Sequence, residues 1–344
     1  MKKVQDYRLK KALAWLETII GDEISTVDIS PVSSDASFRR YFRISSKSYG
    51  NPLILMDSPP EKEPLGRFLS CCKILRELDL KVPFISNYDE NNGFMLLEDF
   101  GNTTLHTHLA EHKTDQKAVY FNAIDQIIKM QSKFERNKKI YISHFKTFSK
   151  KLLTEELSLF KYWYLQTHLG LKLDLSFKKN YEDFGLILIN SMQAESQTLV
   201  HRDFHSKNLM ILRNQQGIGV LDFQDALIGP SSYDLVSLLK DAYTNIKPNI
   251  ATDCLIYFYK KTNEENLLDL GSFESFTKNF HLTAIQRNLK MIGIFSRLKY
   301  RDNKPNYMKF IGRVNARTME ISGQIKELDF LKNFLREIDS NPIK

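Results

Sequence analysis

The sequence predicts an α+β chain with a small antiparallel-sheet lobe followed by a larger helical lobe. The chain has 344 residues, and at roughly 150 residues per domain this is enough for two lobes. Segments rich in β-branched and aromatic residues are concentrated in the first hundred residues, whereas long helical patterns dominate after Gly101. No Gly/Ser-rich linker separates the halves, so we expect two tightly joined lobes at residues 1–98 and 99–344.

The first lobe should begin with a helix and continue as strands. Apolar residues recur at helical spacing up to Gly21, at Leu9, Leu13, Leu16 and Ile20. Strand-like segments follow over residues 24–29, 38–44 and 53–56. A second helix is expected at 65–78, and two further strands should flank the turn Glu90-Asn91-Asn92-Gly93.

The second lobe should be mainly helical. Residues 115–135 carry one apolar face at helical spacing, and a short strand–loop–strand insert lies between Gln197 and Asp222. Helical patterns then resume and continue to the C-terminus. The sequence contains no repeats and no low-complexity runs that would favour another architecture.

Composition limits the classes of function. There are 49 Lys and Arg against 41 Asp and Glu, a net charge of +8 that suits a phosphorylated ligand. The excess is dispersed and no nucleic-acid-binding motif accompanies it, so we expect no nucleic-acid partner. No apolar stretch approaches a membrane span, and the three cysteines form no disulfide or metal pattern. We expect a cytoplasmic monomer with reduced thiols and no membrane partner.

The most informative stretch is a polar loop between apolar segments, His201-Arg202-Asp203-Phe204-His205-Ser206-Lys207-Asn208. After a short hairpin it is followed by Leu221-Asp222-Phe223-Gln224-Asp225. An Asp, an Asn five residues later and then a second Asp-Phe is the spacing of a kinase catalytic loop. The chain therefore resembles the kinase-like phosphotransferases, which include protein kinases and aminoglycoside phosphotransferases. This resemblance implies a two-lobed protein-kinase-like fold. It also implies that the protein uses ATP and Mg²⁺.

The resemblance also implies roles for the polar residues. Asp203 would face the acceptor hydroxyl as base and orienter, while Asn208 and Asp222 would hold Mg²⁺ through oxygen atoms. Lys207 could reach the transferred phosphoryl group or could simply be solvated, as could Arg202. The two histidines of the loop are expected to brace it through hydrogen bonds. The alternative for the whole stretch is a polar turn without chemistry, because Asp and Asn are common turn residues.

The segment after Asp222 separates the subclasses of this superfamily. A protein kinase needs a long activation segment that ends in Ala-Pro-Glu, and neither is present. Gly229-Pro230 followed by Asp234-Leu235 instead resembles small-molecule phosphotransferases of the aminoglycoside type. We therefore expect Asp234 to support the fold or to cap a helix.

Other stretches resemble the bacterial anomeric sugar kinases. They are Asp35-Ala36-Ser37-Phe38-Arg39-Arg40-Tyr41-Phe42-Arg43, Leu96-Leu97-Glu98-Asp99-Phe100-Gly101 and Gln286-Arg287-Asn288-Leu289-Lys290. These kinases phosphorylate N-acetylmuramate and N-acetylglucosamine in cell-wall recycling. The resemblance implies the same reaction here. Alternatives are phosphorylation of another small alcohol, such as an aminoglycoside, choline or a different sugar, and a non-catalytic nucleotide-binding module.

The nucleotide site departs from the protein-kinase pattern in two places. The turn formed by Ser34, Asp35, Ala36 and Ser37 contains no glycine, so it could cradle phosphates or could be an ordinary hairpin turn. The third strand carries no lysine. We expect Arg40 or Arg43 to bind the phosphates instead, the alternative being surface arginines on an edge strand. The resemblance places Leu97, Glu98 and Asp99 at the adenine.

Four residues are candidates for acceptor binding. Trp163 could stack on a sugar ring, although an aromatic stripe on a helix is more often part of a core. Arg287 could pair with a lactyl carboxylate or could lie on an ordinary helical surface. His205 and Asp225 lie close in sequence to the catalytic residues and complete the set.

Overall fold

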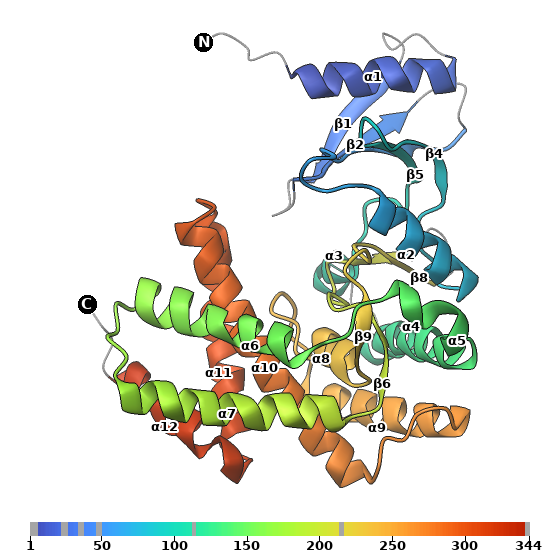
Figure 1. Ribbon diagram of the computed structural model, residues 1–344. Coiled ribbons are helices and arrows are strands. Elements are labelled where there is room, and N and C mark those ends of the chain that lie inside the picture. The colour runs from blue at the N-terminus through green and yellow to red at the C-terminus, as the bar shows by residue number, and fades with distance from the viewer. Residues whose placement is uncertain are drawn as a thin grey trace. The chain divides into compact units, whose positions relative to one another are not determined.

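The computed structural model describes residues 6–21, 27–33, 38–45, 50–111, 115–212 and 217–340. The chain divides into two compact units, and each is considered separately (Figure 1). The first unit comprises Met1–Thr103 and Met210–Gln224, and the second comprises Thr104–Leu209 and Asp225–Lys344. The division thus follows Thr103, and a short segment from the middle of the sequence joins the N-terminal unit.

The first unit is built on an antiparallel sheet of five strands in the order β1-β2-β3-β5-β4. The strands are β1 (Asp28–Ser33), β2 (Arg40–Ser45), β3 (Leu53–Asp57), β4 (Ile85–Asp89) and β5 (Phe94–Glu98). Helix α1 (Tyr7–Ile20) packs on this sheet, with Leu16 of the helix and Leu55 of β3 in the same buried cluster. Helix α2 (Gly66–Glu77) follows β3. The small antiparallel-sheet lobe is confirmed.

Local signals explain the ends of these elements. Asp6 caps α1 by accepting a hydrogen bond from the Leu9 backbone N–H at 3.0 Å, and Gly21 ends the helix at φ 69°. The turn between β4 and β5 ends at Gly93, where φ is 74° and an added Cβ would lie 1.8 Å from the Ser58 carbonyl oxygen. Only glycine fits there. Strand β2 lies between β1 and β3, so the alternative of surface arginines on an edge strand is excluded.

The second unit is mainly helical, as predicted. Its α-helices are α3 (Leu105–Glu111), α4 (Gln116–Arg136), α5 (Lys138–Tyr141), α6 (Lys150–Leu159), α7 (Leu175–Ala194), α8 (Tyr233–Leu239), α9 (Pro248–Glu265), α10 (Phe273–Tyr300), α11 (Ile311–Ser322) and α12 (Asp329–Ser340). The 3₁₀-helices are η2 (Ile142–His144), η5 (Pro305–Phe310) and η6 (Lys326–Leu328), and η3 (Phe160–His168) is a π-helix. Strand β6 (Gln197–Val200) pairs with β9 (Leu227–Pro230) in antiparallel register.

The insert between Gln197 and Asp222 has the expected strand–loop–strand form. After β6 the chain forms the polar loop, and β7 (Leu209–Ile211) then pairs with β8 (Ile218–Val220). The Val220 backbone N–H donates to the Lys81 carbonyl at 2.7 Å, which ties β8 to the first unit. Asp222 lies directly after this strand.

Helix α10 is the centre of the second unit and packs against α6, η3, α7, α8 and α11 (Figure 1). Its middle is buried on all sides, including the polar residues Gln286, Arg287, Asn288 and Lys290. At Gly293 the helix approaches the backbone of Leu159 and Phe160 so closely that an added Cβ would lie 2.4 Å from the Leu159 carbonyl carbon. The segment it touches, η3, is a π-helix, a rare form that occurs often at functional sites.

Cys71, Cys72 and Cys254 are buried, and none of them forms a disulfide among the residues that the structure describes. In the described ranges of the chain, no helix combines the length and apolar character needed to cross a bilayer.

Candidate active site

The polar loop between β6 and β7 is held by two buried carboxylates. The Asp234 carboxylate of α8 accepts hydrogen bonds from the backbone N–H of His201 at 2.7 Å and of Arg202 at 3.0 Å. Asp241 accepts from the backbone N–H of Ser206 at 3.0 Å and from its hydroxyl. Asp234 therefore supports the loop, as the sequence predicts. These anchors fix the backbone on both sides of Asp203.

The Asp203 carboxylate lies in a strongly cationic environment. Arg202 precedes it with φ at 76°, an unusual conformation for a residue with a side chain. Burial disfavours the charged carboxylate, but the Lys290 ammonium, His205 and the Arg287 guanidinium outweigh this and lower the pKa of Asp203 to about 2. The side chain is therefore a carboxylate at every physiological pH.

A buried carboxylate that the sequence did not reveal organises these cations. Glu156 of α6 is 5% exposed and pairs with the Arg202 guanidinium at 2.8 Å and the Lys290 ammonium at 2.9 Å. The Gln286 side-chain amide donates to the same carboxylate at 2.9 Å. A simply solvated Arg202, one of the possibilities left by the sequence, is thereby excluded. We call Glu156, Arg202, Gln286 and Lys290 the support cluster.

Replacing Glu156 with glutamine is expected to lower the free energy of unfolding by about 3 kcal/mol, because two buried cations lose their partner. Burial raises the pKa of Glu156, but Lys290 and Arg202 prevail and hold it below the usual value of 4.5. The contribution of the Glu156 ion pairs to the free energy of unfolding is therefore present in the wild type above pH 4.5. It is lost as the pH falls through the lowered pKa of Glu156. Urea unfolding at pH 7 and pH 4 measures the difference, which should shrink in acid. A constant difference would contradict this account.

The two predicted metal ligands, Asn208 and Asp222, belong to different units and are described separately. In the second unit, the Asn208 amide nitrogen donates to the Asp203 carbonyl at 3.0 Å, which fixes the amide plane. In the first unit, Asp222 is exposed, with φ at 61°, and its carboxylate accepts from the Gln224 side-chain amide at 2.8 Å. A carboxylate and an amide are the hard oxygen donors that Mg²⁺ prefers, so the residues fit this ion.

No group of three or more His, Cys, Asp or Glu side chains that could hold a metal occurs among the residues the structure describes. Mg²⁺ keeps several waters and is usually bound through one or two carboxylates together with substrate phosphates. Binding of this ion by a kinase therefore does not require such a cluster.

Two predicted phosphate-binding arginines have protein partners at all three guanidinium nitrogens. Arg43 pairs with the Asp99 carboxylate at 2.6 Å and also donates to Asn102 and to the Gly101 carbonyl. Arg40 pairs with the fully buried Asp57 at 2.5 Å and with Asp6. Ser34, Asp35, Ala36 and Ser37 lie outside the described residues.

The predicted adenine-binding segment ends β5. Leu97 is buried within the sheet, and Glu98 is exposed at its end. The Glu98 backbone N–H donates to the Phe84 carbonyl at 2.8 Å. The Asp99 carboxylate is held by Arg43 and accepts from the Gly101 backbone N–H at 2.9 Å.

The candidate acceptor residues are spread over several elements of the second unit. Arg287 is 3% exposed and contacts the Met291 sulfur at 3.1 Å, so an ordinary helical surface is excluded for it. Trp163 lies on η3 with its ring 4.9 Å from that of Tyr162. Asp225 is exposed after the second Asp-Phe motif.

Two residues of the polar loop share an aromatic neighbour. The His205 ring lies edge-on to the Tyr243 ring at 5.2 Å, and the Lys207 ammonium lies 3.9 Å from the centroid of the same ring. The centroid of the Tyr243 ring lies 5.0 Å from the centroid of the Phe310 ring on η5. The loop is thus packed against an aromatic cluster that holds both side chains.

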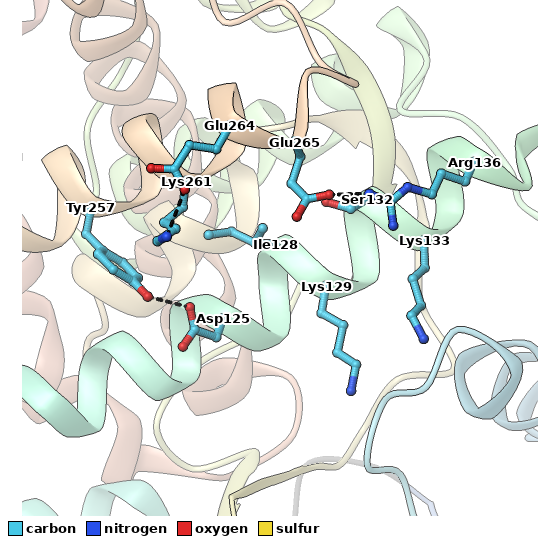
Figure 2. Close-up of a pocket in the computed structure, with 10 residues that line it drawn as sticks. All are labelled: Asp125, Ile128, Lys129, Ser132, Lys133, Arg136, Tyr257, Lys261, Glu264 and Glu265. Atoms are coloured by element: carbon cyan, nitrogen blue, oxygen red, sulfur yellow. Dashed lines mark hydrogen bonds and ion pairs between the residues drawn. The ribbon is translucent and has the colours of Figure 1, made fainter.

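A separate surface pocket of about 430 Å³ lies between α4 and α9 (Figure 2). Its charged residues largely neutralise one another: Arg136 pairs with Glu265 at 2.5 Å and Lys261 with Glu264 at 2.8 Å. The predicted site residues do not line it. Its composition gives no indication of a ligand.

Comparison with known proteins identifies the family of this chain. The model of the phosphotransferase enzyme family matches residues 28–258. An N-acetylmuramate/N-acetylglucosamine kinase of Neisseria meningitidis serogroup B is 33% identical over 90% of this chain and 91% of that protein. A protein of the same name from Pseudomonas putida is 32% identical, over 97% of this chain and 98% of its own length.

Solved structures support the fold. A choline kinase from Cryptosporidium parvum has a TM-score of 0.64 at 11% identity, covering 95% of this chain and 99% of its own. An ADP-bound aminoglycoside phosphotransferase has a TM-score of 0.60 at 14% identity, covering 90% of this chain and 98% of its own. Together with the matched residues, these findings confirm the predicted kinase-like fold. The chain belongs to the phosphotransferase enzyme family and is an enzyme that phosphorylates an alcohol group.

Proposed function

We propose that this chain is an ATP- and Mg²⁺-dependent kinase for the anomeric hydroxyl of N-acetylmuramate, N-acetylglucosamine or both, acting in cell-wall sugar recycling. One observation carries the proposal: 33% identity over 90% of the chain to a kinase named for these two sugars. The three buried cysteine thiols fit a reducing cytoplasm, where ATP is available.

The chemistry proposed for the chain's own residues is mainly positioning. ATP with Mg²⁺ supplies the phosphoryl group and neutralises its charge. Asp203 accepts a hydrogen bond from the acceptor hydroxyl and orients it toward the phosphorus. With a pKa of about 2 it is a weak base, and a loose transition state requires little early proton transfer. Asn208 and Asp222 provide the oxygen ligands, and Lys207 provides charge for the transferred group.

The charges around Asp203 favour one class of acceptor. The four neighbours that lower its pKa are Lys290, His205, Arg287 and Arg202. Arg202, Lys290 and Arg287 carry three positive charges against the two negative charges of Asp203 and Glu156, so these surroundings suit a neutral or anionic sugar better than a cationic one. Aminoglycosides and choline carry positive charge, so these acceptors would be disfavoured, whereas the lactyl carboxylate of N-acetylmuramate would be attracted. Arg287 is our candidate for that contact.

The test is ADP release with ATP and Mg²⁺ across N-acetylmuramate, N-acetylglucosamine, glucose, choline and kanamycin. We expect turnover of one or both N-acetyl sugars, at least about tenfold faster than of the cationic compounds. Turnover of choline or kanamycin alone would overturn the sugar assignment. Thermal shift with ATP, with and without Mg²⁺, shows whether a chain that turns over none of these compounds still binds the nucleotide.

A further inference from the structure

We infer that Arg39, held by Glu63, binds the nucleotide phosphates in place of the lysine that the third strand lacks. Strand β3 reads Leu53 to Asp57 and contains no cation. A kinase of this fold needs a positive side chain at the phosphates, paired with a carboxylate that positions it. The inference rests on the proposed use of ATP and names a residue of that same site.

The pair has a suitable geometry. Arg39 lies just before β2, and its Nε is 2.9 Å from the Glu63 carboxylate. The two side chains are 10% and 19% exposed, so the pair is shielded but remains accessible from one side. The second oxygen of Glu63 accepts from the Phe38 backbone N–H at 2.9 Å. Glu63 therefore fixes both the arginine and the chain that leads into β2.

A series of contacts within the first unit connects this pair to Asp222. The Arg39 guanidinium lies 5.9 Å from the centroid of the Phe68 ring on α2. That ring lies 4.8 Å from the Phe223 ring, in the residue after Asp222. Arg67, the neighbour of Phe68, donates to the Gln224 carbonyl at 2.5 Å. Helix α2 thus holds Arg39 and the proposed metal ligand in one packed arrangement.

The Arg39 side chain has a second partner beside Glu63. It hydrogen-bonds the Tyr41 side chain of β2, the strand that it precedes. An arginine packed in the same unit as the proposed metal ligand Asp222 would suit a nucleotide, since a guanidinium and Mg²⁺ both bind phosphate oxygens.

The neighbouring arginines are less suitable because they are already used. Arg40 and Arg43 each engage protein acceptors through all three guanidinium nitrogens, in ion pairs that hold the sheet together. Removing Arg43 would take away the ion pair of Asp99, and removing Arg40 would leave the buried Asp57 paired with Arg8 alone. A guanidinium suits the phosphate role because its planar fork can bind two phosphate oxygens together.

The test measures binding rather than turnover. Arg39→Met should weaken ATP and ADP binding in calorimetry by about 10- to 100-fold, the loss of one or two charge-assisted hydrogen bonds. The affinity of Arg39→Met for adenosine, which has no phosphates, should stay within about twofold of the affinity of the wild type for adenosine. Arg39→Lys should recover part of the loss, since it keeps the charge but not the fork. Arg76→Met is the control, because Arg76 is exposed on α2 and donates to the Val82 carbonyl.

Each result has a defined meaning. Unchanged ATP affinity in folded Arg39→Met, or an equal loss of adenosine affinity, would overturn the inference. If Arg39→Met does not fold, Arg39→Lys and Glu63→Gln decide the question, and ATP affinity equal to wild type in both would overturn it. If the wild-type protein binds ATP but phosphorylates no sugar, the proposed reaction is refuted, whereas the inference about Arg39 is unaffected. Wild-type protein that does not bind ATP would refute both.

Discussion

Replacement of Asp203 with asparagine is expected to lower kcat by about a thousandfold or more while ATP affinity stays within about threefold. Asparagine fills the same space but offers an amide where the acceptor hydroxyl needs a full acceptor charge. The loop should keep its shape, because Asp234 and Asp241 hold its backbone independently of this side chain. Steady-state kinetics with ADP release and ATP calorimetry measure the two quantities.

The control for this variant is Asp183→Asn, which changes an exposed carboxylate on α7. It removes the same charge at a distance from the loop and should leave kcat within about twofold, as surface substitutions generally do. A kcat of Asp203→Asn equal to that of the wild type would refute the proposed role of Asp203 in orienting the acceptor. A parallel loss of ATP affinity would indicate that the substitution disturbs the nucleotide site as well.

Replacement of Asp222 with alanine is expected to abolish the Mg²⁺ dependence of nucleotide binding and to lower kcat by about a thousandfold. Asp222 follows β8 directly and is held by Gln224, so its carboxylate is fixed while remaining exposed. Without it, the metal keeps one proposed protein ligand, the Asn208 amide. ATP affinity should then equal that of wild-type protein measured in EDTA.

The wild type in EDTA is the internal control for this variant, and unfolding by circular dichroism shows whether Asp222→Ala is intact. If the variant still binds ATP more tightly with Mg²⁺ than without, the metal assignment is wrong. Loss of adenosine binding as well would show that the effect is not confined to the metal.

Local signals in the sequence were sufficient for much of the fold. Apolar spacing and the glycine at position 21 placed α1 within two residues, and the turn ending at Gly93 marked the β4–β5 hairpin. The polar loop was also accessible, because its residues are close in sequence and their spacing is that of a kinase catalytic loop. Asp234 was found for the same reason, through its fixed distance after the Gly-Pro pair.

Contacts between distant residues could not be predicted in this way. Glu156 pairs with Lys290, and Arg39 with Glu63, across intervals that no periodicity reveals. Arg287 was open to assignment on a helical surface because apolar spacing alone cannot show that α10 is surrounded. The position of β2 in the interior of the sheet depends on strand order, which is likewise non-local. The run of polar residues from Gln286 to Lys290, in the middle of a long helical pattern, was the sequence signal that could have indicated the support cluster.

The central claim is that the enzyme transfers phosphate to the anomeric oxygen of an N-acetyl amino sugar. The most direct test is ³¹P NMR of the product formed from ATP, Mg²⁺ and N-acetylmuramate or N-acetylglucosamine. We predict one phosphomonoester signal coupled to the anomeric proton, formed in equal amount with ADP and absent with Asp203→Asn. A phosphomonoester coupled to protons at any other ring position, or no sugar phosphate with either substrate, would contradict the claim.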